Sequence, residues 1–321
     1  MGIKYIYVLV SDEGDFYLEQ ALISIYSLRF YNRDCFIELV IDKDTASSLV
    51  GSRSKIRSYV TSVKEVDVPC EYNKKLKSRY IKTHLRSYVR GTYLFIDCDT
   101  VICDKLNLGE DGEVELAAVA DMNQSLHLYD QSVVSRCEAA GFNNLEGQPY
   151  FNSGVMFVKD TPNTHLFYKE WFENWKSSVA KGVAFDQPAL CQTNVQFGKP
   201  IQELPGIWNC QFKMGGYPYL RDAKIIHYYS NNGESRLSPQ VEMLFSRIKA
   251  SGVIDEGIMN LVHKPKTLFY SYLDMNQDCL FGYLTSSLLH TYYTSPFFFK
   301  VFERMSVIFK GLKSLLSVNH S

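Results

Sequence analysis

Several features that would place a chain in a specialised class are missing from these 321 residues. There is no run of about 18 uninterrupted apolar residues, so we expect no membrane-spanning helix. There is no low-complexity tract or internal repeat, and a net charge of −1 argues against nucleic acid as a partner. The eight cysteines form no Cys-x-x-Cys pair, which is typical of free thiols in a reducing compartment. What remains is an ordinary folded chain with one large core, or a core and a small appendage.

The most informative segment is Asp97-Cys98-Asp99, which follows the apolar run of residues 93–96. Four bulky apolar residues in succession are typical of a strand buried on both faces, as in the centre of a parallel sheet. Residues i and i+2 project to the same side, so the carboxylates of Asp97 and Asp99 can converge on one cation. Two hard oxygen ligands suit Mg²⁺ or Mn²⁺ carrying a diphosphate. The segment indicates metal-assisted handling of a nucleotide diphosphate, although an Asp-x-Asp triplet alone is also common in turns.

A basic helix is expected just upstream, over residues 74–90. Its apolar positions 81, 85 and 89 form one stripe. It carries seven basic residues and no acid: Lys74, Lys75, Lys77, Arg79, Lys82, Arg86 and Arg90. Cations beside a bound metal would balance the charge of two phosphates. We expect Arg79 and Lys82 to make those contacts and the other five to form a solvated face.

Strand and helix signals alternate along the first two thirds of the chain. We expect strands near residues 5–10, 37–41, 63–68, 93–96, 115–120 and 151–158, and helices near 18–30, 46–59, 74–90 and 165–178. This alternation predicts an α/β fold with a mostly parallel central sheet flanked by helices. The first segment is expected to be a strand and not a signal peptide, because it is short and lacks a cleavage site.

The last 31 residues, 291–321, have a different character. Bulky apolar residues recur at helical spacing between four basic residues and one acid, which gives a net charge of +3 over the stretch from Phe298 to Leu316. A basic amphipathic helix with phenylalanine on its apolar side is typical of an anchor at a membrane surface. The alternative is a helix that packs on the rest of the chain or on a second copy.

Five segments, in order, resemble motifs of the family 8 glycosyltransferases, which include glycogenin and the bacterial lipopolysaccharide galactosyl- and glucosyltransferases. The strand ending in Asp97-Cys98-Asp99 resembles the signature strand of that family. The other four are residues 151–156 (Phe-Asn-Ser-Gly-Val-Met), 186–190 (Asp-Gln-Pro-Ala-Leu), 204–209 with 225–228 (ending Ile-Ile-His-Tyr), and the first helix at 21–28. The resemblance covers about residues 3–230.

The resemblance implies a GT-A (Rossmann-like) fold with a mostly parallel central sheet flanked by helices and a C-terminal helical appendage. We expect a catalytic domain over residues 1–230, a helical extension over 231–290 and a membrane-associating tail over 291–321. The resemblance also implies a Mn²⁺ (or Mg²⁺) ion, a UDP-hexose donor and retention of anomeric configuration. Asp97, Asp99 and His227 would hold the metal. Two alternatives stay open: Asp97 could instead contact the ribose, and His227 could be a histidine satisfied in the core.

For the donor sugar, the resemblance places Asn152 and Ser153 as its neighbours. Asp186 would bind sugar hydroxyls, and Gln187 would stabilise an oxocarbenium-like centre, although Asp186 and Gln187 could also simply begin a helix. A covalent nucleophile and attack guided by the leaving phosphate both remain open. Asp12, after the first strand, is expected to contact the nucleotide, and Cys98 lies between the two metal-site aspartates.

Taken together, these expectations describe a metal-dependent enzyme that moves glucose or galactose from UDP onto a glycan or lipid-linked acceptor of a surface polysaccharide or lipopolysaccharide. It would be cytoplasmic and peripheral on the inner face of the membrane. A sugar nucleotidyltransferase is disfavoured because the first strand lacks a Gly-rich basic loop. An inverting transferase, or a nucleotide-sugar or glycan-binding protein with weak catalysis, is the other alternative. One departure is that His227 has no lysine soon after it; Lys264-Pro265 comes much later.

Overall fold

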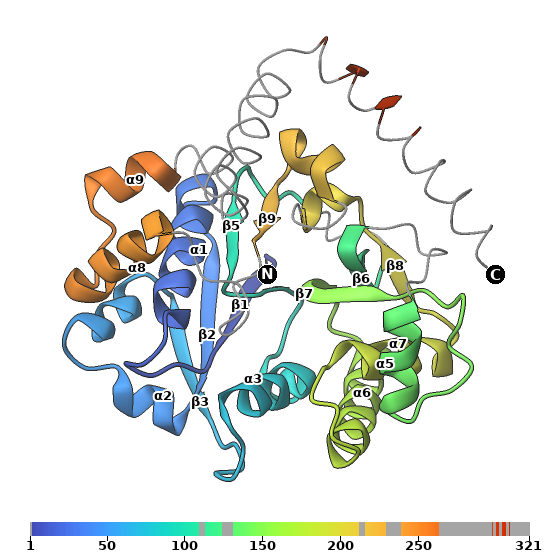
Figure 1. The fold of residues 1–321 in the computed structure, drawn as a ribbon. Coiled ribbons are helices and arrows are strands. Elements are labelled where there is room, and N and C mark those ends of the chain that lie inside the picture. Colours follow the sequence, from blue (N-terminus) through green and yellow to red (C-terminus); the bar gives the residue numbers. More distant parts are fainter. Residues whose placement is uncertain are drawn as a thin grey trace.

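The computed structural model describes residues 2–108, 113–123, 131–211, 216–228 and 239–262, together with Phe297, Lys300, Val301, Arg304, Met305 and Ile308 of the tail. Seven strands form the central sheet in the order β3-β2-β1-β4-β7-β6-β8, and β5 and β9 form a second, two-stranded sheet (Figure 1). The strands are β1 Lys4–Leu9, β2 Phe36–Asp42, β3 Ser62–Val66, β4 Tyr93–Ile96, β5 Thr100–Ile102, β6 Leu116–Ala120, β7 Phe151–Val158, β8 Ile201–Glu203 and β9 Ile225–His227. The helices are α1 Tyr17–Tyr31, α2 Lys43–Ser48, α3 Lys74–Thr83, α4 Leu85–Tyr88, α5 Gln131–Ala139, α6 Pro162–Ala180, α7 Gln187–Gln196, α8 Pro239–Ser251 and α9 Glu256–Val262.

The sheet is mostly parallel, as the alternating pattern predicted. β1 pairs in parallel with both β2 and β4, and β2 with β3 and β6 with β8 are also parallel. β7 runs antiparallel to its neighbours β4 and β6. Because β7 runs antiparallel to β4, the first half of β7 lies beside the end of β4, which Asp97 follows directly. Two far-separated motifs of the chain therefore meet at one edge of the sheet.

Alternation along β1 explains why helices cover both faces of the sheet. Tyr5, Tyr7 and Leu9 belong to the hydrophobic core that also contains residues of α1, whereas Ile6 and Val8 belong to a second core that contains residues of α3, α6 and α7. In Figure 1, α8 and α9 lie beside α1, and α5, α6 and α7 gather near β6, β7 and β8. The two cores together fill the space on either side of β1 and β4.

Two predicted helices are interrupted. The expected helix over residues 74–90 is broken at His84, whose backbone (φ −100°, ψ 6°) separates α3 from α4. The expected helix over residues 46–59 is wrong in its middle: α2 ends at Ser48, and a 3₁₀ helix, Gly51–Ser58, follows. Gly51 has a φ of +54°, a left-handed conformation that ends regular helix and that glycine adopts without strain.

The small sheet brings the end of the family-like motif at 225–228 to the turn after β4. Thr100 of β5 lies opposite His227 of β9, and the Tyr228 amide donates to the Asp99 carbonyl at 3.1 Å. These contacts bring Asp99 and His227, which are 128 positions apart in the sequence, against each other. The pairing of β5 with β9 is thus what brings His227 to the two aspartates.

The helices α8 and α9 pack on the N-terminal half of the chain. Phe245 and Ile248 of α8 are fully buried in the same core as β1 and α1, and the Phe245 ring lies 5.7 Å from that of Phe16. Of the extension expected over residues 231–290, the structure describes residues 239–262. This part contributes side chains to the same core as β1 and α1. The rest of the expected extension lies outside the described residues. Within the described part of the chain, no helix is both long and apolar enough to cross a membrane.

Candidate functional site

A cleft of about 740 Å³ lies where β1 and β4 end and β7 begins. The carboxyl ends of parallel strands are the usual position of ligand sites in open α/β sheets. The residues that line it come from β1, α1, α3, the β4–β5 turn, β7 and the start of α7: Val8, Leu9, Val10, Tyr17, Gln20, Lys74, Lys75, Ser78, Arg79, Lys82, Asp97, Cys98, Asp99, Asn152, Ser153, Gly154, Phe185, Asp186, Gln187 and His227. Ten of the eleven site residues expected from the sequence are among them, and Asp12 is the exception.

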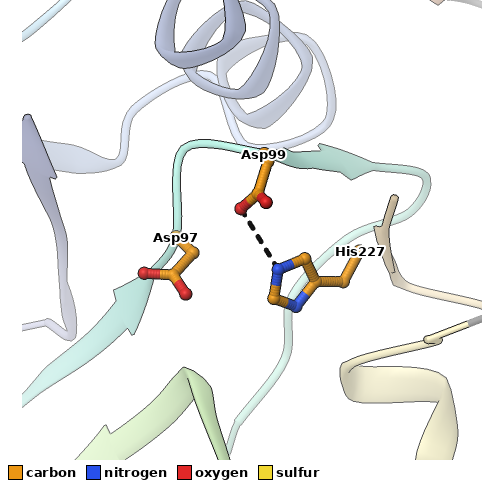
Figure 2. A group of neighbouring side chains, drawn as sticks. All are labelled: Asp97, Asp99 and His227. Carbon is orange, nitrogen blue, oxygen red and sulfur yellow. Dashed lines mark hydrogen bonds and ion pairs between the residues drawn. The ribbon is translucent and has the colours of Figure 1, made fainter. Parts of the chain in front are cut away.

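Asp97, Asp99 and His227 form one cluster in this cleft. One ligand atom from each of the three lies within 4.8 Å of the other two. Figure 2 shows the two carboxylates on the segment between β4 and β5, with the His227 ring facing them from β9 and its Nε2 atom 3.1 Å from Asp99 Oδ1. The expected convergence of residues 97 and 99 is therefore present, and a nitrogen donor completes the group.

His227 is buried and held in a fixed orientation. Its Nδ1 atom lies 3.0 Å from Asn209 Oδ1, so the amide oxygen accepts a hydrogen bond from Nδ1–H. The other ring nitrogen, Nε2, faces Asp99 and is the atom that would bind a cation. Hydrogen bonds of this kind fix the tautomer and the ring orientation of metal-binding histidines. Asn209 was not among the residues expected from the sequence.

Gly154 of β7 lies close to two residues of this cluster, His227 and Asp97. A Cβ atom at this position would lie 2.5 Å from His227 Cε1 and 2.8 Å from Asp97 Oδ2. The Gly154 carbonyl also accepts a hydrogen bond of 2.7 Å from the Asp97 amide. The absence of a side chain therefore lets β7 approach both ligand groups.

The donor set fits a divalent cation. Two carboxylates suit Mg²⁺ and Mn²⁺, and the added imidazole favours Mn²⁺ over Mg²⁺, because imidazole binds transition metals more readily. Asp97 and Asp99 are only partly buried, so water or a ligand can take the remaining positions. Among the described residues this cluster is the one group of histidine, cysteine and acidic side chains with metal-ligand spacing.

Asp186 lies at the other end of the cleft, bound by two cations. Arg79 Nε is 3.0 Å from Asp186 Oδ1, Lys82 Nζ is 3.5 Å from Oδ2, and the Ser153 hydroxyl donates to Oδ2 at 2.6 Å. Burial would raise the pKa of Asp186, but the charges of Lys82 and Arg79 and the Ser153 hydrogen bond outweigh it and lower the pKa to about 2. Asp186 is therefore a fixed anion at any working pH.

Asp121 is a second carboxylate next to this group; it does not line the cleft, and it was not among the site residues expected from the sequence. Its Oδ1 atom accepts a 3.0 Å hydrogen bond from Asn152 Nδ2. Burial raises the pKa of Asp121, and hydrogen bonds from Asn152 and Gln187 only partly offset that effect. The amide oxygen of Asn152 in turn accepts from Asn209 Nδ2 at 2.8 Å. A chain of hydrogen bonds thus runs from Asp121 through Asn152 and Asn209 to His227.

Asp12 and Cys98 lie differently from the other expected residues. Asp12 is half-exposed, is absent from the lining of the cleft and pairs with Lys74, whose Nζ is 2.5 Å from Asp12 Oδ1. Cys98 lines the cleft, but its thiol donates to the Val8 carbonyl at 3.3 Å. Burial raises the pKa of Cys98, and the adjacent Asp97 and Asp99 raise it further, so it stays a neutral thiol.

The expectation of a solvated face for the remaining cations is wrong for two of them. Lys77 is 8% exposed and pairs with Asp42 and Asp44. Arg86 is 2% exposed and pairs with Asp160. Lys74 and Lys75 line the cleft, and only Arg90 is simply exposed. Buried cations of this kind require carboxylate partners, and those partners lie far along the chain.

Comparison with known proteins adds a family and a fold. The model of glycosyl transferase family 8 matches residues 9–235. An active-site mutant of LgtC is 15% identical, with 82% of this chain and 100% of that chain covered and a TM-score of 0.52. The apo structure of WbbM, a bifunctional glycosyltransferase, is 17% identical, with 81% of this chain and 51% of that chain covered and a TM-score of 0.51.

A third structure, the apo form of mouse xyloside xylosyltransferase 1, is 14% identical, with coverage of 73% of this chain and 99% of that chain and a TM-score of 0.45. No curated protein matches the sequence. At identities this low, the likeness to the LgtC mutant and to WbbM shows a shared fold and nothing finer.

Proposed function

The chain belongs to glycosyl transferase family 8 and has the GT-A fold, and we propose that it transfers a hexose from a UDP-sugar to a glycan or glycolipid acceptor with retention of anomeric configuration. The observation that carries this proposal is the cleft itself. It holds a possible metal cluster, Asp97, Asp99 and His227, beside a group of hydroxyl-binding residues around Asp186. A nucleotide sugar needs both: one end for the diphosphate and one for the hexose.

Asp97, Asp99 and His227 are the residues that would hold Mn²⁺ or Mg²⁺. When bound there, the cation supplies positive charge against the diphosphate leaving group. Lys82 and Arg79 add two further positive charges on the α3 side of the cleft, and Lys82 lies 3.1 Å from Asp97 Oδ2. Charge neutralisation by fixed groups lowers the barrier because UDP leaves as an anion.

Asp186, Asn152 and Ser153 would bind the hydroxyls of the hexose. Gln187, which lies at the start of α7 and lines the cleft, would contact the anomeric side. Asp121 adds a carboxylate to the same group through its hydrogen bond with Asn152. These groups suit a neutral sugar, because a negatively charged one would meet the buried carboxylate of Asp186 and the nearby carboxylate of Asp121.

Retention by attack guided by the leaving phosphate is favoured over a covalent intermediate. Gln187 carries an amide, which is a weak nucleophile. Asp186 is bound to Arg79, Lys82 and Ser153, so its carboxylate oxygens are engaged and its basicity is low. Both features disfavour a bond between the enzyme and the sugar.

We also propose a lipid-linked acceptor at the inner membrane surface in the synthesis of a surface polysaccharide or lipopolysaccharide, which would make the protein cytoplasmic and peripheral on that surface. The support is the tail: its described residues Phe297, Val301, Met305 and Ile308 are helical and between 37% and 69% exposed. Lys300 and Arg304 lie among them and are exposed too. Most of residues 291–321 lie outside the described residues, so the amphipathic pattern of the sequence carries the rest of this proposal.

UDP release from a panel of UDP-hexoses, with Mn²⁺ and with EDTA, tests the proposed function. We expect slow, metal-dependent hydrolysis of one donor. The Asp99→Asn variant should lower the rate at least about tenfold, because it removes a charged donor from the cluster. Asp104→Asn is the matched control, since Asp104 is an exposed acid after β5 that pairs with Lys224 at 3.2 Å. Mn²⁺-dependent UDP binding without release from any donor would favour a binding protein, and failure to bind UDP would contradict the proposal.

A further inference from the structure

Three side chains meet at the mouth of the cleft and have no role in the reaction described above. Phe185 comes just before α7, Lys75 lies in the first turn of α3, and Arg136 lies on α5. Phe185 and Lys75 line the cleft, and Arg136 contacts Phe185 from outside it. We call Lys75, Arg136 and Phe185 the mouth cluster.

The Phe185 ring holds both cations. Lys75 Nζ lies 4.1 Å from the ring centroid, and the Arg136 guanidinium carbon lies 5.0 Å from it. Contacts of a cation with an aromatic ring at this distance are attractive, which reduces the freedom of two otherwise flexible side chains. Phe185 is 39% exposed, so the cluster stays open to solvent. The two charges are thus held near one another at an accessible position.

Within the described residues, no close ion pair balances the positive charge of the mouth cluster. Lys74, Lys77, Arg79 and Lys82 on the same helix each pair with a carboxylate. Within the parts of the chain that the structure describes, Lys75 and Arg136 each contact Phe185 and form no ion pair with an acid. Partial burial and the nearby charge of Arg79 lower the pKa of Lys75. An anion bound between the two side chains would relieve this repulsion.

The charge of the cleft reverses from its mouth to the sugar end. At the sugar end, Asp186 provides a buried carboxylate that already has Arg79, Lys82 and Ser153 as partners, and the Asp121 carboxylate accepts a hydrogen bond from Asn152. That end suits the hydroxyls of a neutral hexose. Of these two ends, the mouth, between Lys75 and Arg136, is therefore the more favourable position for an acidic group of the acceptor.

From this arrangement we propose that the mouth cluster is an acceptor subsite that selects an anionic glycan, one whose carboxylate or phosphate pairs with Lys75 and Arg136. Phe185 acts as a positioning residue that holds the two cations. The inference rests on the proposed function, since it names the class of the acceptor that the same cleft would glycosylate.

An array of matched glycans tests this subsite in the full chain, with UDP and Mn²⁺ present. The array consists of sets of three glycans that share one backbone and differ only in the terminal residue: a hexose, the matching uronic acid, or the hexose with a phosphate. We expect the acidic members to retain the protein about tenfold better than the neutral ones, the amount that two charge-assisted contacts supply. The carboxylate and phosphate members, and competition by free inorganic phosphate, distinguish the source of the anion.

The double variant Lys75→Gln, Arg136→Gln should lose this preference, and Phe185→Leu should weaken it. Lys176→Gln is the matched control, because Lys176 lies 4.9 Å from the Phe172 ring but outside the cleft lining. Equal retention of neutral and acidic members by the wild type, including no retention at all, would overturn the inference. So would a preference that survives in the double variant.

UDP affinity, measured by calorimetry on the same proteins, keeps this test separate from that of the proposed function. A wild type that does not bind UDP with Mn²⁺ contradicts the proposed function itself. A wild type that binds UDP but shows no acidic preference contradicts the acceptor subsite alone. A double variant whose UDP affinity falls in parallel with its glycan binding would assign these cations to the donor diphosphate and would also overturn the subsite.

Discussion

At the scale of single residues, Gly154 sets the distance between β7 and the metal cluster. We expect Gly154→Ala to lower the Mn²⁺-dependent affinity for UDP at least about tenfold, because the added methyl group would displace His227 or Asp97 from its ligand position. Calorimetric titration of UDP with and without Mn²⁺ measures the effect. The control is Gly257→Ala on α9, where the nearest atom to an added Cβ is the Asp255 carboxylate at 3.3 Å. Unaltered UDP binding by the Gly154 variant would show that the cluster tolerates the methyl group.

Much of the cleft could be expected from local sequence. Asp97 and Asp99 follow an entirely apolar strand, and Asp186-Gln187 stands where a helix begins; the structure brings all four to one cleft. Asp121 and Asn209 could not be identified in the same way, because they act through hydrogen bonds to Asn152, 31 and 57 residues away. One signal was present for Asp121: it follows a predicted strand, as Asp97 does.

At the scale of elements, an ion pair between the buried Arg86 and the partly exposed Asp160 joins α4 to the residues just before α6. Arg86, at 2% exposed, pairs with Asp160, and His165 Nε2 lies 2.9 Å from Asp160 Oδ1. Burial would raise the pKa of Asp160, but hydrogen bonds from His165, the Gly91 amide and Arg86 outweigh it, and the pKa is well below 3.8. The folded state therefore binds the ionised form of Asp160 more strongly than the unfolded chain does.

We expect Asp160→Asn to lower the free energy of unfolding at pH 7 by about 2 kcal/mol, since it leaves a buried guanidinium without its anion. Because the folded pKa is depressed, this stabilisation is complete above about pH 4 and is lost as pH falls through the lowered pKa. Urea unfolding of the wild type and the variant at pH 7, 5 and 3.5 should show that the difference between their free energies of unfolding narrows only at pH 3.5. Asp67→Asn, in an exposed pair with Lys43, should change little at any of them. A gap that widens with acid would contradict this account.

The element boundaries show where local pattern stops being informative. The apolar stripe at positions 81, 85 and 89 runs across the break at His84, so the periodicity suggests one helix where the structure has two. The stripe also does not predict that Lys77 and Arg86 are buried. Their burial depends on carboxylate partners elsewhere in the fold: Asp42, Asp44 and Asp160. The direction of β7 could not be predicted from the sequence either, because the alternation of side chains along a strand is the same in parallel and antiparallel pairs.

At the scale of the whole molecule, α8 is attached to the loop that leads from β1 to α1. Lys249 Nζ donates to the Asp15 carbonyl at 2.9 Å and to the Glu13 carbonyl, and the Asp15 carboxylate in turn accepts from Lys74, which lines the cleft. Lys249 of α8 is thus connected through Asp15 to Lys74, a residue that lines the cleft.

We expect Lys249→Met to raise the KM for the nucleotide sugar about threefold to tenfold with little change in kcat, since it frees the loop without touching the substrate. Steady-state kinetics on the preferred donor measure this split. Lys55→Met is the matched control, because Lys55 Nζ donates to the Ser251 carbonyl at 2.9 Å at the same interface but away from the loop. An equal effect of the two variants would show that α8 contributes only general stability.

The tail gives a second prediction at this scale. The full chain should sediment with vesicles that contain anionic lipid and remain in solution with neutral ones. Reversing two charges in Lys300→Glu, Arg304→Glu should weaken the association at least about tenfold, because each basic residue near an anionic surface contributes about 1 kcal/mol. Lys55→Glu, at an exposed site in the 3₁₀ helix, controls for the change in net charge. Equal binding to neutral vesicles would contradict an electrostatic contribution.

Lys82 makes the two ends of the cleft dependent on each other. Its ammonium lies 3.1 Å from Asp97 Oδ2 and 3.5 Å from Asp186 Oδ2, so the two carboxylates share one cation. A divalent ion drawn to Asp97 competes with Lys82 for that carboxylate and leaves the lysine to Asp186. Under the proposed function, occupancy at one end would therefore alter affinity at the other, by the same factor in both directions. Any cooperativity between metal and donor sugar would pass through this single ammonium group.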